Sequence, residues 1–88
     1  MATALITGAT AGIGAAYSQL LAKQGLDLVL VARDLPRLNN IANQLKKHHK
    51  IKVETIKADL TKPLQLAKVE KRLAIQSKPI DVLINNAG

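Results

Sequence analysis

Residues 5–17 read LITGATAGIGAAY, an apolar run that changes into a helical pattern and holds glycines at positions 8, 12 and 14. Each glycine costs backbone entropy on folding, so three of them are expected only where the main chain bends sharply or is approached closely. A phosphate bound by backbone N–H groups at the start of a helix is the usual reason for such a loop. The stretch therefore predicts a phosphate-binding turn between a strand and a helix, and a glycine-rich turn without a ligand is the alternative.

Each glycine of this loop has a separate predicted task. Gly8 makes the tight turn, Gly12 lets the main chain approach a pyrophosphate, and Gly14 lets the helix pack against the sheet. The first helical N–H groups and the positive end of the helix dipole then face the phosphates. The other candidate contacts in this loop are Thr10, Ala11 and Ile13.

Four segments of the chain have the patterns of strands. Residues 4–7, 28–32 and 82–84 are short apolar runs, which are typical of parallel strands covered on both faces. The segment that begins at Ile51, IKVETI, alternates apolar and polar residues instead. It is therefore predicted to lie at an edge of the sheet, with one face toward water.

Three helical patterns separate these strands. The first has apolar residues at i, i+3, i+4, i+7 and i+8 from Ile13 and ends at Gly25, so Tyr17 is predicted to lie in the core. The second helix is predicted to begin with Asp34 as its N-cap, and the third with Thr61 as its N-cap. The predicted buried faces are Leu38, Ile41, Ala42 and Leu45 in the second helix and Leu66, Val69 and Leu73 in the third.

The alternation of these elements predicts an α/β fold with the order β-α-β-α-β-α-β. Right-handed crossovers place the strands in the order 3-2-1-4. This is the N-terminal part of a Rossmann-like, doubly wound parallel sheet, namely one mononucleotide-binding half and the strand beyond the switch point. Residues 1–88 are accordingly interpreted as part of a single domain.

Composition argues against several classes of function. The chain has no cysteine, which excludes a disulfide framework, a cysteine nucleophile and a cysteine zinc site. Its net charge of +7 would suit a nucleic acid or an anionic membrane, but no Phe or Trp is available to stack on bases. We expect residues 46–57 to be solvated and His48 and His49 to bind no metal. We also expect a cytoplasmic protein that binds neither nucleic acid nor membrane.

Three motifs together resemble those of the short-chain dehydrogenase/reductase family. TGATAGIG at residues 7–14, ADL at residues 58–60 and NNAG at residues 85–88 occur in the order and with the separations of that family. The resemblance implies an NAD(P)-dependent oxidoreductase with a small carbonyl or alcohol substrate. It also implies that the full-length protein is a homo-oligomer.

The resemblance also implies roles for individual residues. Asp59 contacts the adenine amino group, and Leu60 lines the adenine pocket. Asn86, Ala87 and Gly88 lie against the adenosine ribose and the central sheet. The residues alone leave open that the aspartate simply ends a strand and that the asparagines simply turn the chain.

Cofactor choice is predicted at the end of the second strand. An acidic residue there binds the ribose 2′-hydroxyl of NAD, whereas an arginine accommodates the 2′-phosphate of NADP. In the register of the family the acidic position falls on Ala32 and is followed by Arg33, which favours NADP. Asp34 is interpreted as a helix cap, which leaves NAD as an alternative cofactor. Ala11 replaces another basic NADP marker of the family, and Arg37 is interpreted as a solvated helix residue.

The catalytic groups that the resemblance implies are not assigned to any of these residues. In the family a serine and a Tyr-x-x-x-Lys pair lie well beyond NNAG, and the tyrosine transfers the substrate proton. Tyr17 is followed four residues later by Leu21 and not by lysine. We therefore expect an N-terminal fragment, inactive alone, of an NADP-preferring enzyme that transfers hydride between nicotinamide and a carbonyl or alcohol. The alternative is a noncatalytic or vestigial nucleotide-binding protein.

Overall fold

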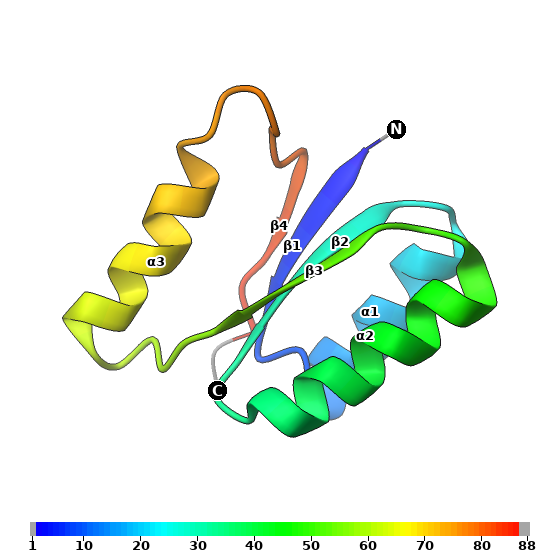
Figure 1. Ribbon diagram of the computed structural model, residues 1–88, viewed down its shortest axis with the longest axis horizontal. Helices are drawn as coiled ribbons and strands as arrows, with labels where there is room; N and C mark the ends of the chain where they lie inside the picture. The colour runs from blue at the N-terminus through cyan, green and yellow to red at the C-terminus, as the bar shows by residue number, and fades with distance from the viewer. Residues whose placement is uncertain (1, 87–88) are drawn as a thin grey trace.

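The computed structural model describes residues 2–86, which form a four-stranded parallel sheet with helices on both faces (Figure 1). The strand order is β3-β2-β1-β4, which confirms the predicted topology. None of the helices within these residues has the length and apolar character needed to cross a membrane. The strands are β1 (Thr3–Thr7), β2 (Asp27–Ala32), β3 (Val53–Lys57) and β4 (Val82–Ile84), and the helices are α1 (Gly12–Lys23), α2 (Leu35–His49) and α3 (Pro63–Leu73).

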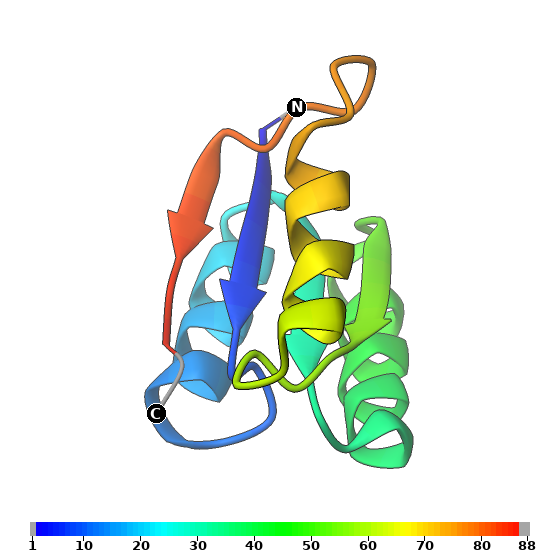
Figure 2. The same ribbon diagram turned by 90° about the vertical axis from the view of Figure 1, so that its left-hand side faces the viewer.

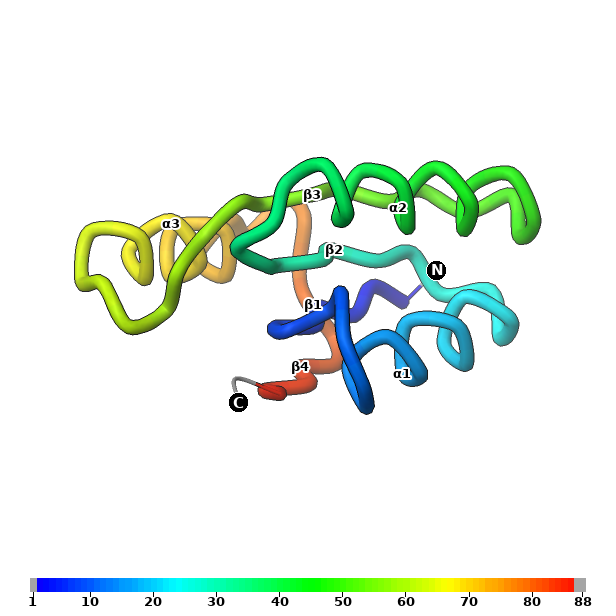
Figure 3. Tube along the Cα trace, turned by 90° about the horizontal axis from the view of Figure 1, so that it is seen from below, coloured from blue at the N-terminus to red at the C-terminus, as the bar shows by residue number. Residues whose placement is uncertain are grey.

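The sheet separates two apolar cores. Helices α1 and α2 lie on one face of the sheet and α3 lies on the other (Figures 1 and 3). Side chains alternate between the faces along a strand, so Ile6 of β1 packs with the α1 and α2 side whereas Leu5 packs with the α3 side. Strand β3 is at one edge, as predicted. Strand β4 is at the other edge, where α3 does not cover it and Leu83 is 53% exposed (Figure 2).

Helix α1 buries a different face from the one predicted. Tyr17 is 40% exposed and Ile13 is 64% exposed, so the prediction that this apolar face lies in the core is wrong. The buried residues are the small Gly14, Ser18 and Ala22, which let the helix approach the sheet closely. The Ser18 hydroxyl donates to the carbonyl oxygen of Gly14 at 2.9 Å, so its burial leaves no polar group unpaired.

The helix caps follow the prediction in α2 but not in α3. Asp34 is the N-cap of α2, and its carboxylate accepts the backbone N–H of Arg37 at 3.2 Å. The predicted buried face of α2 is also confirmed. The N-cap of α3 is Lys62 and not Thr61, because the Thr61 hydroxyl donates to the carboxylate of Asp59 instead.

An ion pair replaces part of the apolar contact predicted for α3. Val69 is buried, but Leu66 and Leu73 are each 39% exposed, so the predicted face is only partly covered. Arg72 is only 8% exposed, and its Nε lies 2.8 Å from Oε2 of Glu54 on β3. The same guanidinium donates to a carbonyl oxygen of the loop between α3 and β4 at 2.7 Å. Helix α3 is therefore joined to the edge of the sheet by a charged side chain.

Candidate nucleotide-binding site

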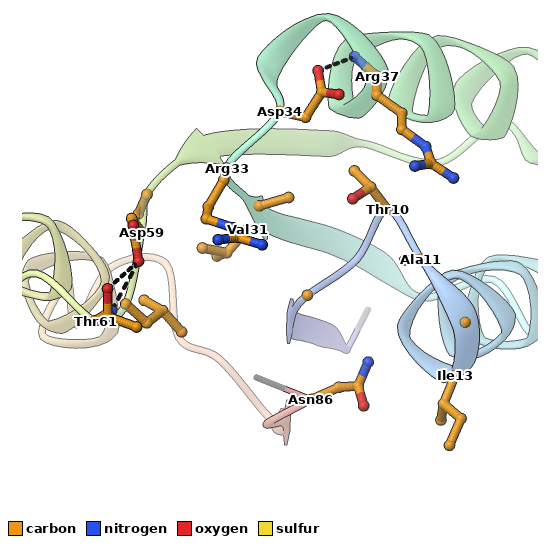
Figure 4. A pocket seen from close by; sticks show the side chains of 15 residues that line it. Thr10, Ala11, Ile13, Val31, Arg33, Asp34, Arg37, Asp59, Thr61 and Asn86 are labelled. Carbon is orange, nitrogen blue, oxygen red and sulfur yellow. Dashed lines mark hydrogen bonds between the residues drawn. The ribbon is translucent and has the colours of Figure 1, made fainter. Parts of the chain in front are cut away.

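A pocket of about 590 Å³ opens where the carboxyl ends of the strands meet (Figure 4). In a doubly wound sheet this is the edge at which ligands bind. Of the predicted contact residues, Gly14 is buried beside the pocket, and Ala87 and Gly88 lie outside the described residues. The predicted residues that line the pocket are Gly8, Thr10, Ala11, Gly12, Ile13, Arg33, Asp59, Leu60 and Asn86.

The three glycines of the loop differ in what surrounds them. Gly8 has a φ of +62° and Gly12 a φ of +52°, a region that residues with side chains rarely adopt. A Cβ on Gly8 would collide with the carbonyl oxygen of Asn86, and a Cβ on Gly14 would collide with the carbonyl group of Gly8. Apart from its chain neighbours and the backbone of its own helix, a Cβ on Gly12 would meet no atom of residues 2–86 within 4 Å. Gly8 and Gly14 thus allow close packing, whereas Gly12 leaves an open surface on the pocket.

A buried hydroxyl joins this loop to the segment after β4. Thr7, at the end of β1, is 3% exposed. Its Oγ1 accepts the backbone N–H of Asn86 at 2.9 Å and donates to Oδ1 of Asn85 at 3.0 Å. These bonds place Asn86 against Gly8 at the rim of the pocket. No role for Thr7 is predicted from the sequence. Its position at the end of a buried strand indicates only that its hydroxyl needs a hydrogen-bond partner.

Asp59 is held at the pocket wall by a local turn. Its Oδ1 accepts the backbone N–H of Thr61 at 3.0 Å and the Thr61 hydroxyl at 2.6 Å, while its own N–H donates to Oε1 of Gln65 at 2.6 Å. The two bonds from Thr61, together with the nearby charges of Arg33 and Lys62, lower the pKa of Asp59 below its usual value. The carboxylate is therefore ionised at neutral pH and available as an acceptor for an amino group.

The turn between β2 and α2 brings two arginines to the pocket. Arg33 and Arg37 both line it, and their side chains extend toward its open space (Figure 4). Asp34 lies between them in the sequence and caps α2. Within residues 2–86, neither guanidinium group forms an ion pair or a hydrogen bond. Arg37 is exposed, as its interpretation as a solvated residue requires, but it also borders the pocket.

Several residues that line the pocket are not among the contacts predicted from the sequence. Val31 and Ala58 are buried strand-end residues whose patterns match those of ordinary core residues. Thr61, the predicted cap of the third helix, also lines the pocket, and its hydroxyl donates to Asp59. No local pattern distinguishes such residues from structural ones.

The N-terminus of α1 completes an anion-binding surface. Its N-cap is Ala11, which makes no side-chain hydrogen bond to the helix, and its first turn has no acidic residue. The first N–H groups of a helix need partners from outside the helix. Together with the exposed arginines and the apolar strand ends, this arrangement is that of a nucleotide-binding site on a doubly wound sheet. The chain belongs to the short-chain dehydrogenase family, whose family model matches residues 2–88.

Related proteins share this structure over nearly the whole chain. A short-chain dehydrogenase from Sphingobium yanoikuyae, in complex with NADPH, is 51% identical with a TM-score of 0.95, covering 100% of this chain and 34% of its own. A bulky-bulky ketone specific alcohol dehydrogenase from Comamonas testosteroni is 48% identical with a TM-score of 0.94, and the match covers 100% of this chain and 35% of that enzyme. A very-long-chain 3-oxoacyl-CoA reductase from Lodderomyces elongisporus is 39% identical over 85 residues, and the match covers 97% of this chain and 24% of that reductase. The chain therefore spans about a quarter to a third of the length of these relatives.

Proposed function

We propose that residues 1–88 are the N-terminal, adenosine-binding part of an NADP-preferring short-chain dehydrogenase/reductase. The complete protein would transfer hydride between C4 of nicotinamide and a carbonyl or alcohol carbon of a small-molecule substrate, as a cytoplasmic homo-oligomer. The observation that carries this proposal is the N-terminus of α1, which opens on the pocket without a side-chain cap, whereas Asp34 caps α2. Its N–H groups are available to a pyrophosphate.

The residues present fit the parts of an NADP molecule. Gly12 leaves open space through which a pyrophosphate can approach the start of α1. Asp59 offers an ionised carboxylate to the adenine amino group, beside Leu60 in the same wall. Arg33 and Asn86 line the same pocket, where the arginine would pair with the ribose 2′-phosphate and the asparagine would border the ribose. The bound cofactor would supply the hydride, while these residues bind and orient its adenosine half.

The preference for NADP follows from the side chains at the end of β2. Ala32, at the acidic position of the family, is 6% exposed and has no group that could accept a ribose 2′-hydroxyl. Asp34, the nearest carboxylate in the sequence, is engaged as the cap of α2. Arg33 is exposed and, within residues 2–86, unpaired. The NADPH complex of the Sphingobium relative supports the same assignment.

The proton-transfer groups are proposed to come from the part of the enzyme that the relatives have beyond the matched region. Tyr17, the single tyrosine of these residues, is on the outer side of α1 and does not line the pocket. We therefore expect the 88 residues alone to show no NADPH-dependent carbonyl reduction. Measurable turnover by this purified chain, with contaminating enzymes excluded, would contradict the assignment.

The test of the proposed function is cofactor binding by the full-length protein. Arg33→Ala should weaken NADPH binding by roughly 10- to 100-fold, because a hydrogen bond to a charged group contributes about 1.5–3 kcal/mol. NADH binding should be nearly unchanged, and adding Ala32→Asp should shift the preference further toward NADH. Lys47→Ala removes the same charge from the exposed far end of α2 and is the control. An unchanged ratio of the two dissociation constants in Arg33→Ala would refute the NADP preference.

A further inference from the structure

Arg37 lies at the pocket but has no part in the contacts described so far. It is in the first turn of α2, four residues after Arg33, and both residues line the pocket. In Figure 4 both side chains extend from the β2–α2 region to the rim of the pocket, with Thr10 between their guanidinium groups. Two guanidinium groups thus border the pocket, one from the residue after β2 and one from the first turn of α2.

Within residues 2–86, the acidic residue between the two arginines caps α2 and forms an ion pair with neither of them. Asp34 is the acidic residue closest to both in the sequence, and it could form an ion pair with either one. Its Oδ1 instead accepts the backbone N–H of Arg37 at 3.2 Å. Across the pocket, Asp59 is affected by the charge of Arg33, but its hydrogen bonds go to Thr61. Both guanidinium groups therefore keep their donors available.

We propose that Arg37 is a second specificity-determining residue for the ribose 2′-phosphate, which Arg33 and Arg37 would hold between them. This inference rests on the proposed function, because it assumes that the adenosine half of the cofactor binds in this pocket. It extends that function by giving Arg37, and not Arg33 alone, a share in the choice between NADP and NAD.

The charge of the ligand is the physical reason for two arginines. A phosphate monoester carries about −1.5 to −2 charges at pH 7 and has three acceptor oxygens, more than one guanidinium can neutralise. Arginine donates in a planar fork that matches two phosphate oxygens at once. A helix N-terminus next to the same site also favours negative charge. A ligand without the 2′-phosphate offers Arg37 no such partner, so its contribution is specific to NADP.

Two small nucleotides isolate this contribution from the nicotinamide half of the site. Adenosine 2′,5′-bisphosphate carries the 2′-phosphate, and 5′-AMP lacks it. Calorimetric titration of the full-length protein at fixed ionic strength would compare wild type, Arg37→Gln and Lys47→Ala. Glutamine preserves the helix propensity at position 37, and Lys47→Ala removes one charge from the exposed last turn of the same helix.

Arg37→Gln is expected to weaken binding of adenosine 2′,5′-bisphosphate about tenfold, which corresponds to about 1.4 kcal/mol. Binding of 5′-AMP should change less than about twofold in this variant, and Lys47→Ala should change neither nucleotide by more than that. Equal effects of Arg37→Gln and Lys47→Ala would overturn the inference, because Arg37 would then act only through net charge. If wild type binds neither nucleotide, the proposed function itself fails, and this outcome is distinct from failure of the inference.

Discussion

Replacing Gly12 by asparagine would separate the ligand-binding role of the glycine loop from its role in folding. Gly12 has a φ of +52°, and an added Cβ would meet no atom of residues 2–86 within 4 Å apart from its chain neighbours and the backbone of its own helix. Asparagine enters left-handed conformations more readily than most residues, so Gly12→Asn can keep the backbone of the loop. Its side chain would project from a residue that lines the pocket, into the space proposed for the pyrophosphate.

The expected effects on stability and on binding differ in size. The left-handed conformation costs a residue with a side chain about 1–2 kcal/mol. This energy is an upper limit for the decrease in the free energy of unfolding in Gly12→Asn. Displacing the pyrophosphate removes hydrogen bonds from main-chain N–H groups to a charged ligand, each worth about 1.5–3 kcal/mol. The loss of two such bonds would weaken NADPH binding by roughly 100-fold or more.

Gly25→Asn is the matched control. Gly25 follows the C-terminal end of α1 and has a φ of +87°. Apart from its chain neighbours, no atom of the described residues lies within 4 Å of an added Cβ. Urea unfolding would give the free energy of unfolding of each full-length variant, and fluorescence titration would give the NADPH dissociation constant. Both variants should lose similar stability, but only Gly12→Asn should lose affinity. A folded Gly12→Asn protein that binds NADPH as tightly as wild type would refute this account of the loop.

Three further predictions concern the stability of the fold, each measured by urea unfolding. Lys50 is the C-cap of α2 and has a φ of 52°. Lys50→Gly should raise the free energy of unfolding by about 0.5–1 kcal/mol. It relieves about 1–2 kcal/mol of left-handed backbone strain, which exceeds the roughly 0.4–1 kcal/mol by which the greater freedom of glycine stabilises the unfolded chain. A lower urea midpoint would contradict it. Arg72→Met should lower the free energy of unfolding by about 1–3 kcal/mol. This is less than the loss on breaking a fully buried ion pair, because the Glu54 side chain is 43% exposed. An unchanged free energy of unfolding would mean that the ion pair does not hold α3 against the sheet. Hydrogen bonds from Thr61 lower the pKa of Asp59 in the folded state. The ionised Asp59 carboxylate therefore stabilises the fold at pH values above its unfolded pKa of about 3.9, and this contribution is lost as the pH falls through the lower pKa of the folded state. Asp59→Asn should therefore flatten the acid limb of the stability curve, and an unchanged limb would argue against this.

The features that could be predicted from the sequence depend on local patterns. Short apolar runs identify β1 and β2, and the right-handed crossovers of a doubly wound sheet then predict the strand order. Asp34 followed by a proline indicates the cap of α2. Once Asp34 is assigned to the helix, Arg33 is left as the charged residue at the end of β2, and the structure places it in the pocket.

The features that could not be predicted depend on which surfaces meet. The apolar periodicity of α1 selects Tyr17, but the close fit of Gly14 under the carbonyl group of Gly8 turns the opposite, small-residue face inward. A helical pattern shows which side chains are apolar and does not show which elements cover them. For the same reason neither the burial of Arg72 nor the partial exposure of Leu66 could be predicted from the helical pattern.

The hydrogen bond between Thr7 and Asn86 joins residues that are 79 positions apart. Contacts with large sequence separation form only after a long loop has been closed, which makes them slow to form. The rim of the pocket is therefore completed only after the chain has been synthesised as far as Asn86 and β4 has paired with β1. A ligand that binds only the completed pocket stabilises only chains that have reached this stage. The cofactor would thus act during biosynthesis as a check on the pairing of β4 with β1, favouring chains in which these two strands are correctly assembled.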